Sequence, residues 1–451
     1  MANKRVLIIT YYWPPTGASG VQRWLKFSRY LPENGWKPVV YTPENPERPA
    51  VDHSLEADIP AEAEIIKHPI FEPYGLYKKL TGRKQDEAIQ VGFASESKKP
   101  GLAETVSRWL RGNCLIPDAR RFWIGPSVRK LNRYLSDYPV DVIVSTGPPH
   151  SLHLIALHLK KSTKTPWLAD FRDPWTGIYY HEELRLTERS KTKHLRLEKS
   201  VLQQADRVIT VSNSIRSELE QIGGRPVDVI HNGYDPADFE GLNTHQSNTA
   251  KSFTLSHIGT FLPSSNPETL WQTLGRLSDS RGDFAADLKI SLVGKVDDTI
   301  RESISKYGLN KYVHYTPWVP HSEVMRYQVA SSLLLLCVPA TEGAGGIITG
   351  KFFEYLASGT PILSIGPAGG DTAAIIRQCR AGDTAGPDDA AAMERIVINY
   401  YEKWKMGEPN VPDRDAISKY SRREQTRELA GMLNNLTRNV PDIRSDKKNV
   451  F

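Results

Sequence analysis

Short apolar runs alternate along the chain with longer amphipathic stretches. In the first half, runs rich in Val, Ile and Leu occupy residues 5–10, 39–42, 142–145, 167–170, 208–211 and 229–231. Amphipathic stretches lie between them, at 21–31, 151–160, 183–204 and 214–222. Nearly continuous apolar strands that alternate with helices are typical of parallel sheets covered by helices on both faces. The pattern therefore predicts a doubly wound α/β unit in this half.

A second array of the same kind follows a polar stretch at 241–252. Its apolar runs are 253–258, 289–293, 313–315, 333–338 and 361–364, and 421–436 has the pattern of a terminal helix. We therefore predict two Rossmann-like doubly wound domains that face each other across a cleft, with a C-terminal helix. The predicted boundaries are 1–245, 246–415, and 416–451 for the helix and tail. Ligands of such folds bind at the carboxyl ends of the strands.

Composition excludes several classes of protein. The 451 residues include 10 Trp, 19 Tyr and 12 Phe, which is too aromatic for a fully disordered chain. Three widely spaced Cys cannot form a disulfide scaffold and fit a reducing compartment. The apolar runs are far shorter than the ~20 residues of a membrane helix, and the first is too short for a signal peptide. We expect a cytoplasmic protein, with peripheral contact to the inner face of the cytoplasmic membrane left open.

Positive charge is concentrated in one segment that does not follow the strand–helix rhythm. The whole chain has a formal charge of +6, and residues 71–133 hold 13 Lys or Arg against 6 Asp or Glu, mixed with aromatic residues. Basic and aromatic residues together suit an anionic membrane surface, because the rings enter the headgroup layer while the cations meet phosphates. A solvated insertion with its own small apolar face is the alternative. The rest of the chain is nearly neutral, so we expect no nucleic-acid partner.

Four glycine-bearing turns follow predicted strands, and each could hold a phosphate. Glycines let backbone N–H groups approach an anion, and a following helix N-terminus adds partial positive charge. Plain strand-to-helix turns are the alternative interpretation for each one alone. The candidate residues are Gly17, Ser19 and Gly20, before a helix predicted at Val21; Gly259 and Thr260; Gly294 and Lys295; and Gly345, Gly346 and Ile347.

The last of these turns precedes a predicted helix that contains Lys351 and Glu354. Residues three apart share a helix face near its N-terminus. The cation could meet a diphosphate, and the carboxylate could accept hydrogen bonds from both hydroxyls of a ribose. A local salt pair is the alternative.

Polar residues also follow two strands of the first predicted domain. His150 lies after residues 142–145, where it could orient a substrate or cap the next helix. Asp170, Arg172 and Asp173 follow 167–170. The Arg could neutralise one Asp while the other accepts hydrogen bonds from a sugar, although an internal ion-pair cluster is the alternative. We therefore list His150, Asp170, Arg172 and Asp173 as candidate catalytic residues.

Other chemistries have little support in the sequence. No Cys or His cluster has the spacing of a zinc site, and Asp413-x-Asp415 precedes a helix that it would cap. We therefore predict no metal site. No Gly-x-Ser-x-Gly motif is present, so a hydrolase triad lacks its nucleophile.

Several motifs in this order resemble the retaining GT-B glycosyltransferases of family four. The resemblance runs from about residue 4 to about residue 435. The motifs are Tyr-Trp-Pro-Pro at 12–15 with Gly20-Val21, Ala-Asp-Arg-Val-Ile-Thr-Val-Ser at 205–212, Val-Ile-His-Asn-Gly-Tyr-Asp at 229–235, and Gly-Lys-Phe-Phe-Glu-Tyr-Leu-Ala-Ser-Gly-Thr-Pro at 350–361.

The resemblance implies roles for individual residues of the second domain. Glu354 is similar to the second Glu of the family's Glu-x7-Glu motif, which holds the donor ribose. The first Glu would fall at Gly346, so this chain departs from the motif, and backbone at 345–347 would make that contact instead. The family's Arg and Lys after the first strand of this domain are also missing, and Lys295 and Lys351 are the substitutes that we expect.

Three further positions match the family. Trp318 and Val319 correspond to the position that packs on the nucleotide base. His150 is similar to the histidine near the transferred sugar. Residues 17–20 are similar to the loop that covers the donor phosphate and the acceptor.

These implications predict a nucleotide-sugar-dependent glycosyltransferase that retains the anomeric configuration without a metal. No cofactor is expected, because the nucleotide-diphosphate sugar is a substrate. The expected partners are that donor and a sugar or lipid-linked acceptor of glycolipid or polysaccharide synthesis. The rival hypotheses are a sugar-nucleotide 2-epimerase, and a non-catalytic scaffold of the same fold at the membrane.

Overall fold

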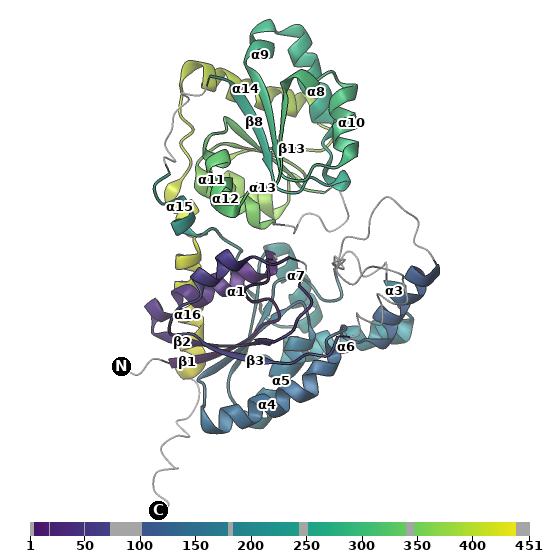
Figure 1. Cartoon of the computed structure of the whole chain (residues 1–451), viewed down its shortest axis with the longest axis vertical. Coiled ribbons are helices and arrows are strands. Elements are labelled where there is room, and N and C mark those ends of the chain that lie inside the picture. The colour runs from purple at the N-terminus through teal and green to yellow at the C-terminus, as the bar shows by residue number, and fades with distance from the viewer. Residues whose placement is uncertain are drawn as a thin grey trace, which may run out of the picture. The chain divides into compact units, whose positions relative to one another are not determined.

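A computed structural model describes residues 4–17, 19–48, 50–72, 102–178, 184–242, 251–339, 346 and 348–438 (Figure 1). These residues divide into two compact units. The first comprises Met1–His231 and Gln425–Phe451, and the second comprises Asn232–Glu424. The predicted boundary at residue 245 differs from this division for a simple reason. Tyr234 exchanges backbone hydrogen bonds with the segment at Tyr420 and Arg422, which ties residues after His231 to the second unit.

The first unit is a seven-stranded parallel sheet in the order β3-β2-β1-β4-β5-β6-β7. Its strands are β1 Lys4–Ile9, β2 Trp36–Pro43, β3 Glu64–His68, β4 Val142–Gly147, β5 Trp167–Phe171, β6 Arg207–Thr210 and β7 Asp228–Val229. Its helices are α1 Ser19–Tyr30, α3 Leu102–Cys114, α4 Ile124–Asp137, α5 Ser151–Thr163, α6 Glu188–Gln204, α7 Asn213–Gly223 and α16 Arg422–Arg438. The order reverses between β1 and β4, which is the switch point of a Rossmann fold.

Alternate side chains of this sheet fill two separate cores. One face packs against α4, α5, α6 and α7, and Leu131, Ile155 and Val201 are among its buried residues. The other face packs against α1 and α16, which contribute Trp24 and Leu433. The C-terminal helix therefore completes the core of the first unit, although it comes last in the sequence.

The second unit repeats the same plan with six strands in the order β10-β9-β8-β11-β12-β13. Its strands are β8 Phe253–Ile258, β9 Leu288–Val293, β10 Val313–Thr316, β11 Leu333–Cys337, β12 Ile362–Ile365 and β13 Gly382–Ala385. Its helices are α8 Glu268–Ser280, α9 Gly282–Asp287, α10 Asp298–Lys306, α11 His321–Val329, α12 Gly350–Ser358, α13 Asp371–Cys379, α14 Ala390–Met406 and α15 Arg414–Ser418. Helices α8, α10 and α14 cover one face, and α12, α13 and α15 cover the other.

The predicted fold class, two Rossmann-like doubly wound domains and a C-terminal helix, is confirmed. Two strands were missed, β3 and β13, and both lie at an edge of their sheet. The centre of the predicted linker, 243–250, and the part of the basic segment at 73–101 lie outside the described residues.

Candidate functional site

The carboxyl ends of β1, β4 and β5 bring three predicted loops of the first unit to one edge of the sheet. These strands are neighbours, because β4 pairs with both β1 and β5. Helix α1 begins at Ser19, so Ser19 and Gly20 belong to its first turn and not, as predicted, to a loop that ends at Val21. Gly17 donates its N–H to the carbonyl of Ala50 at 2.9 Å, which holds the loop before α1 against the segment after β2.

Arg172 lies over this first turn of α1. A Cβ at Gly20 would overlap Nη1 of Arg172, so glycine leaves the space that the guanidinium occupies. The Arg172 Cζ lies 5.7 Å from the centre of the Tyr12 ring, and Nη2 is 3.4 Å from Oδ2 of Asp173. Gly20, Arg172 and Asp173 therefore lie together, as the strand-end argument predicted. A guanidinium here can contact an anionic oxygen with two N–H groups.

Asp170 occupies a different environment from Asp173. Its carboxylate is fully buried and accepts hydrogen bonds from Arg23, from the Trp24 indole at 2.6 Å and from the Thr146 hydroxyl at 2.9 Å. The neutralising cation is thus Arg23 of α1, whose Nη1 also donates to the carbonyl of Ile230 at 2.9 Å. Because protein donors surround both oxygens, this geometry gives Asp170 a positioning role and leaves Arg172 and Asp173 at the edge.

His150 directly precedes α5, and its imidazole stacks on the Trp175 indole with ring centres 4.7 Å apart and planes 5° apart. The next histidine, His153, is fully buried and its Nδ1 lies 2.8 Å from the Ser145 hydroxyl. Burial lowers the pKa of His153 to about 3, against a smaller opposite effect of Asp170. His153 is therefore a neutral core residue at physiological pH, whereas His150 keeps its place at the end of β4.

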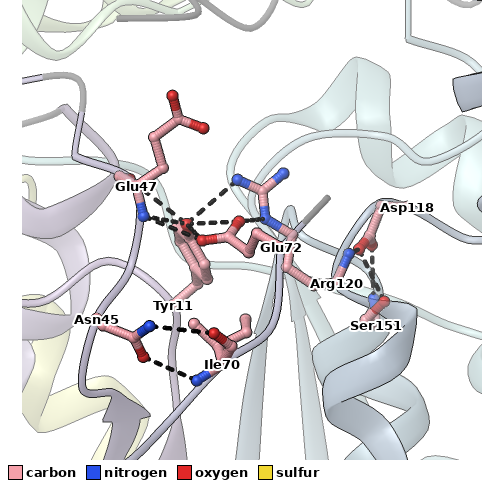
Figure 2. Close-up of polar contacts among 8 residues, drawn as sticks. All are labelled: Tyr11, Asn45, Glu47, Ile70, Glu72, Asp118, Arg120 and Ser151. Atoms are coloured by element: carbon pink, nitrogen blue, oxygen red, sulfur yellow. Dashed lines mark hydrogen bonds and ion pairs between the residues drawn. The ribbon is translucent and has the colours of Figure 1, made fainter. Parts of the chain in front are cut away.

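A polar cluster fixes the start of α5 (Figure 2). Tyr11 donates its hydroxyl to Glu72 at 2.8 Å, and Glu72 forms an ion pair with Nε of Arg120 at 2.9 Å. Two residues before Arg120, Asp118 accepts hydrogen bonds from the backbone N–H and the hydroxyl of Ser151, each at 2.8 Å. Burial raises the pKa of Tyr11 far above its usual range, so its hydroxyl stays protonated. The cluster joins the ends of β1 and β3 to the residue after His150.

In the second unit, two of the predicted glycines lie side by side at the ends of β8 and β9. Gly259 has a φ of +112° and Gly294 a φ of +110°, conformations that favour glycine. A Cβ at Gly294 would lie 2.7 Å from the Gly259 carbonyl oxygen. The two strand ends therefore approach each other closely. Gly259 also lies next to the side chain of Lys351, because a Cβ at Gly259 would be 3.7 Å from the Lys351 Nζ.

Lys351 lies in the first turn of α12, and its side chain extends to the same edge of the sheet, next to Gly259. Its Nζ lies 2.8 Å from Nε2 of His257, and the His257 ring stacks on Phe261 with ring centres 3.8 Å apart. Burial lowers the pKa of Lys351 to about 8, while Cys337 and Glu354 oppose the shift. Burial and the neighbouring ammonium hold the pKa of His257 well below its usual range. A neutral imidazole therefore accepts a hydrogen bond from a buried lysine.

Glu354 lies one turn after Lys351, and the two side chains contact different partners. The Glu354 carboxylate accepts from the Gln328 amide at 3.2 Å and lies 3.3 Å from Nε2 of His321. It remains partly exposed, at 20% of its side-chain surface. The contacts with α11 hold Glu354 in place and leave part of the carboxylate open to a ligand hydroxyl.

The remaining predicted residues are scattered around this edge. Trp318 is 78% exposed, so its indole presents an open face, and Val319 packs on the core beside α12. Thr260 and Lys295 are exposed, and Gly346 has a 3-10 helical conformation. Gly345 and Ile347 lie outside the described residues, as does the side chain of Ser19.

Sequence reasoning missed four residues of the first unit: Arg23, Trp175, His194 and Glu198. The spacing of His194 and Glu198 could have indicated a shared role, because residues four apart lie on one helix face. Both face the loop at Trp175, whose indole donates to Nδ1 of His194 at 3.1 Å. Glu198 accepts from the backbone N–H groups of Trp175 and Thr176, and burial raises the pKa of Glu198 to about 7.

The described residues contain no group of three or more His, Cys, Asp or Glu side chains that could hold a metal ion. None of the helices placed by the structure combines the length and the apolar character needed to cross a bilayer.

Residues 19–238 match the family model described as Glycosyltransferase Family 4. The first unit is thus similar to Glycosyltransferase Family 4. This match, nearly half of the sequence, covers the edge of the first unit where Gly20, His150 and Arg172 lie. It makes this unit a glycosyltransferase domain, although it does not identify the donor, the acceptor or the stereochemistry.

Solved structures of glycosyltransferases share the fold over nearly the whole of this chain. Sucrose-phosphate synthase from Thermosynechococcus elongatus is 14% identical, with a TM-score of 0.60 and coverage of 97% of this chain and 100% of that one. An α,α-trehalose-phosphate synthase (UDP-forming) from Burkholderia vietnamiensis is 12% identical, with a TM-score of 0.61 and coverage of 98% and 99%. HepE from Anabaena, solved with UDP and glucose, is 14% identical, with a TM-score of 0.56 and coverage of 96% and 100%. No curated protein sequence matches this chain.

Proposed function

We propose that this protein transfers a sugar from a nucleotide-diphosphate sugar to a sugar or lipid-linked acceptor. The second unit binds the donor, and the carboxyl edge of the first unit handles the acceptor and the transferred sugar. The glycosyltransferase domain and the UDP complex of the fold relative HepE support a nucleotide-sugar donor. The single observation that carries the proposal is the buried Lys351 ammonium beneath the paired glycines at the ends of β8 and β9.

Lys351 suits a diphosphate because no carboxylate of the described residues forms a hydrogen bond with its ammonium. Among the described residues its ammonium donates to the neutral His257 ring, and burial disfavours the charged form, which lowers the pKa of Lys351. A phosphate oxygen would give the ammonium an anionic partner that stabilises its charged form. The N-terminus of α12 adds partial positive charge, and the buried Thr349 hydroxyl before it has no hydrogen-bond partner among the described residues. Gly259 and Gly294 leave the backbone close enough to line the same ligand.

Glu354 and Trp318 complete the donor site in this proposal. The Glu354 carboxylate accepts from the ribose hydroxyls, and Trp318 with Val319 contacts the base. Lys295, exposed beside Gly294, adds a second positive charge. The backbone at 345–347 replaces the missing first Glu of the Glu-x7-Glu pattern.

The chemistry follows from where charge develops. When the sugar–phosphate bond breaks, negative charge collects on the leaving diphosphate, and Lys351 with the α12 N-terminus stabilises that charge. We propose that transfer needs no divalent metal and retains the anomeric configuration through front-face attack, with the leaving phosphate accepting the acceptor's proton. His150 and Arg172 then orient the transferred sugar and the acceptor. No covalent intermediate on the protein is required.

The first unit also presents an apolar and basic surface that suits an anionic membrane. Helix α3 exposes Val106, Trp109 and Leu110, and Phe71 contacts Phe122 edge to face with both rings exposed. Helix α6, joined to α3 by the Thr187 N–H donating to Asn113 at 2.8 Å, exposes Arg189, Lys193, Arg196 and Lys199 on the face opposite its buried side. We propose that these two helices, the α3–α6 surface, hold the enzyme at a lipid-linked acceptor.

The test of the function is a binding screen followed by a transfer assay. Calorimetry against UDP, GDP, ADP, CDP and TDP identifies the base, and the matching nucleotide sugars are then incubated with and without acceptor lipids or oligosaccharides, with EDTA or Mg²⁺. Slow hydrolysis of one donor that accelerates with an acceptor supports transfer. Tight binding to none of the diphosphates contradicts the proposal and favours a scaffold, and release of an epimer from the donor alone contradicts it in favour of an epimerase.

A further inference from the structure

His150 is oriented by the aromatic ring behind it. Its imidazole lies almost parallel to the Trp175 indole, with ring centres 4.7 Å apart, and both side chains are buried to more than nine-tenths. His150 sits directly before α5, so its backbone is fixed by the helix and by Asp118, which caps Ser151. The Trp175 indole therefore determines how the His150 imidazole is rotated about its side-chain bonds.

Trp175 in turn is held by one face of α6. Its indole N–H donates to Nδ1 of His194 at 3.1 Å, and its backbone N–H donates to Glu198 at 3.3 Å. His194 and Glu198 are four residues apart, so they project from the same side of the helix. The tryptophan is thus fixed at both its backbone and its ring edge.

The chain of contacts continues from His194 to α3. Nε2 of His194 lies 3.3 Å from the Gly112 carbonyl oxygen. A carbonyl only accepts and the indole only donates, so the two contacts require a neutral imidazole with its proton on Nε2. Burial lowers the pKa of His194, which favours this neutral form. A Cβ at Gly112 would lie 2.9 Å from Cβ of Leu184, so α3 closely approaches the segment that precedes α6.

We propose that His194 is a positioning residue for His150, and that the sequence Gly112 carbonyl, His194, Trp175 transmits the placement of α3 to the imidazole at the end of β4. This inference rests on the proposed function in one respect, which is that His150 faces the transferred sugar. The contacts themselves stand without it. The consequence is that α3, one of the two helices of the α3–α6 surface, and the candidate catalytic edge are mechanically joined through a neutral histidine.

The substitutions follow from the hydrogen-bond directions. His194→Gln keeps an acceptor for the Trp175 indole and a donor for the Gly112 carbonyl, whereas His194→Leu keeps volume and loses both. Trp175→Phe retains an aromatic partner for His150 but removes the N–H. His158→Leu is the matched control, because His158 is an exposed histidine of α5 whose Nδ1 contacts the Leu154 carbonyl.

The first readout is independent of catalysis. In the full-length protein with labelled histidine, the imidazole C–H resonance of His150 is assigned as the signal lost in His150→Gln. We expect an upfield ring-current shift from Trp175 in the wild type, in His194→Gln and in His158→Leu. We expect most of this shift to disappear in His194→Leu and in Trp175→Phe, with melting temperatures checked for each variant. An unchanged His150 resonance in both of these variants overturns the proposal.

The second readout uses the donor found in the binding screen. His194→Leu should lower kcat about tenfold, equivalent to about 1.4 kcal/mol, because the reacting groups are misoriented. KM for the nucleotide sugar should stay within about twofold, and His194→Gln should restore kcat. Loss of the shift with unchanged kcat overturns the positioning role. A wild-type enzyme that neither transfers nor hydrolyses any nucleotide sugar sinks the proposed function instead, and the resonance of His150 still decides whether α3 and His150 are joined.

Discussion

Lys351 and His257 form a buried pair in which a lysine ammonium donates to a neutral imidazole across 2.8 Å. Burial lowers the pKa of Lys351 from 10.5 to about 8, so the folded protein loses this proton at a lower pH than the unfolded chain does. Between these values the unfolded state binds more protons, so this residue's contribution to stability increases as pH rises through the window. An anionic ligand reverses the preference, because it stabilises the charged form.

The first prediction concerns the pH dependence of ligand binding. A bound nucleoside diphosphate should raise the pKa of Lys351, so binding above pH 8 takes up a proton. We expect affinity to be constant below about pH 8 and to fall by up to about tenfold per pH unit above it. Calorimetry in buffers of different ionisation enthalpy counts the protons. Lys351→Met should bind more weakly and without this pH dependence, and Lys295→Met is the control that keeps it. A wild-type affinity that is flat to pH 9.5 would contradict a phosphate role for Lys351.

The second prediction concerns Glu354. Two hydrogen bonds from a ribose to a carboxylate are worth about 1.5–3 kcal/mol each, so Glu354→Ala should weaken nucleoside diphosphate binding by tenfold or more and remove most turnover. Gln328 and His321 lose their partner in this variant, so its melting temperature is measured alongside. Glu323→Ala, at an exposed acid of α11, is the matched control. Unchanged affinity in Glu354→Ala rules out the ribose contact.

The third prediction separates structure from chemistry at Asp170. Arg23→Met leaves a fully buried carboxylate without its cation, and breaking such a pair costs about 3–5 kcal/mol. The Arg207–Asp228 pair, at 2.7 Å but one-third exposed, is the comparison, and Arg207→Met should cost less than about 1 kcal/mol. Urea unfolding followed by circular dichroism measures both. Equal losses in the two variants would show that the Asp170 cluster is not a structural anchor.

The fold was predictable wherever buried strands consist of apolar residues that the sequence displays directly. The central strand β11 is a continuous apolar run, Leu-Leu-Leu-Leu-Cys, and β4 begins with Val-Ile-Val, because helices cover both faces of each sheet. The edge strands carry a weaker signal. β3 reads Glu-Ile-Ile-Lys-His and is only half-buried, and β13 reads Gly-Asp-Thr-Ala and joins the sheet through its backbone bonds to β12. Backbone pairing leaves no residue pattern to detect.

The sequence predicted where the candidate site residues lie better than it predicted what each of them does. Parallel strands gather their carboxyl ends at one edge, and that rule located Arg172, His150, Gly259 and Lys351. It could not tell that Asp170 is paired by Arg23, because that partner lies 147 residues away on α1. Long-range ion pairs depend on how helices dock, and local spacing carries no information about that docking.

The fourth prediction tests the space beside Arg172. Gly20→Ala should push the guanidinium away from Tyr12 and lower kcat, because the added methyl group overlaps Nη1. In an Arg172→Ala background the same change should have little further effect, as a double-mutant cycle would show. Gly282→Ala, where a Cβ meets nothing within 4 Å, controls for the substitution itself. Additive effects of Gly20→Ala and Arg172→Ala would mean that Gly20 acts by another route.

The fifth prediction concerns the α3–α6 surface and depends on charge as well as apolar contact. Glu188, the sole exposed acid of α6, forms an ion pair with Lys191 at 2.8 Å. The exposed face of α6 is therefore uniformly basic and carries Arg189, Lys193, Arg196 and Lys199. Each such cation near an anionic bilayer is worth about 1 kcal/mol. Arg189→Glu with Arg196→Glu should therefore abolish sedimentation with vesicles of phosphatidylglycerol and phosphatidylcholine at low salt. Trp109→Ser on α3 should weaken it at all salt concentrations, because the indole contributes apolar contact.

The control for this surface is a pair of changes on the second unit. Arg276→Glu with Arg395→Glu reverses the same amount of charge on α8 and α14. Because neither residue belongs to the α3–α6 surface, it should leave vesicle binding close to wild type, although it also removes the Arg276–Glu394 ion pair at the surface. High salt should release the wild-type protein, since the Debye length shrinks from ~10 Å at 0.1 M to ~3 Å at 1 M. Wild-type binding that persists at 1 M salt, or equal losses in both charge-reversal variants, would show that the basic face of α6 is not what meets the lipid.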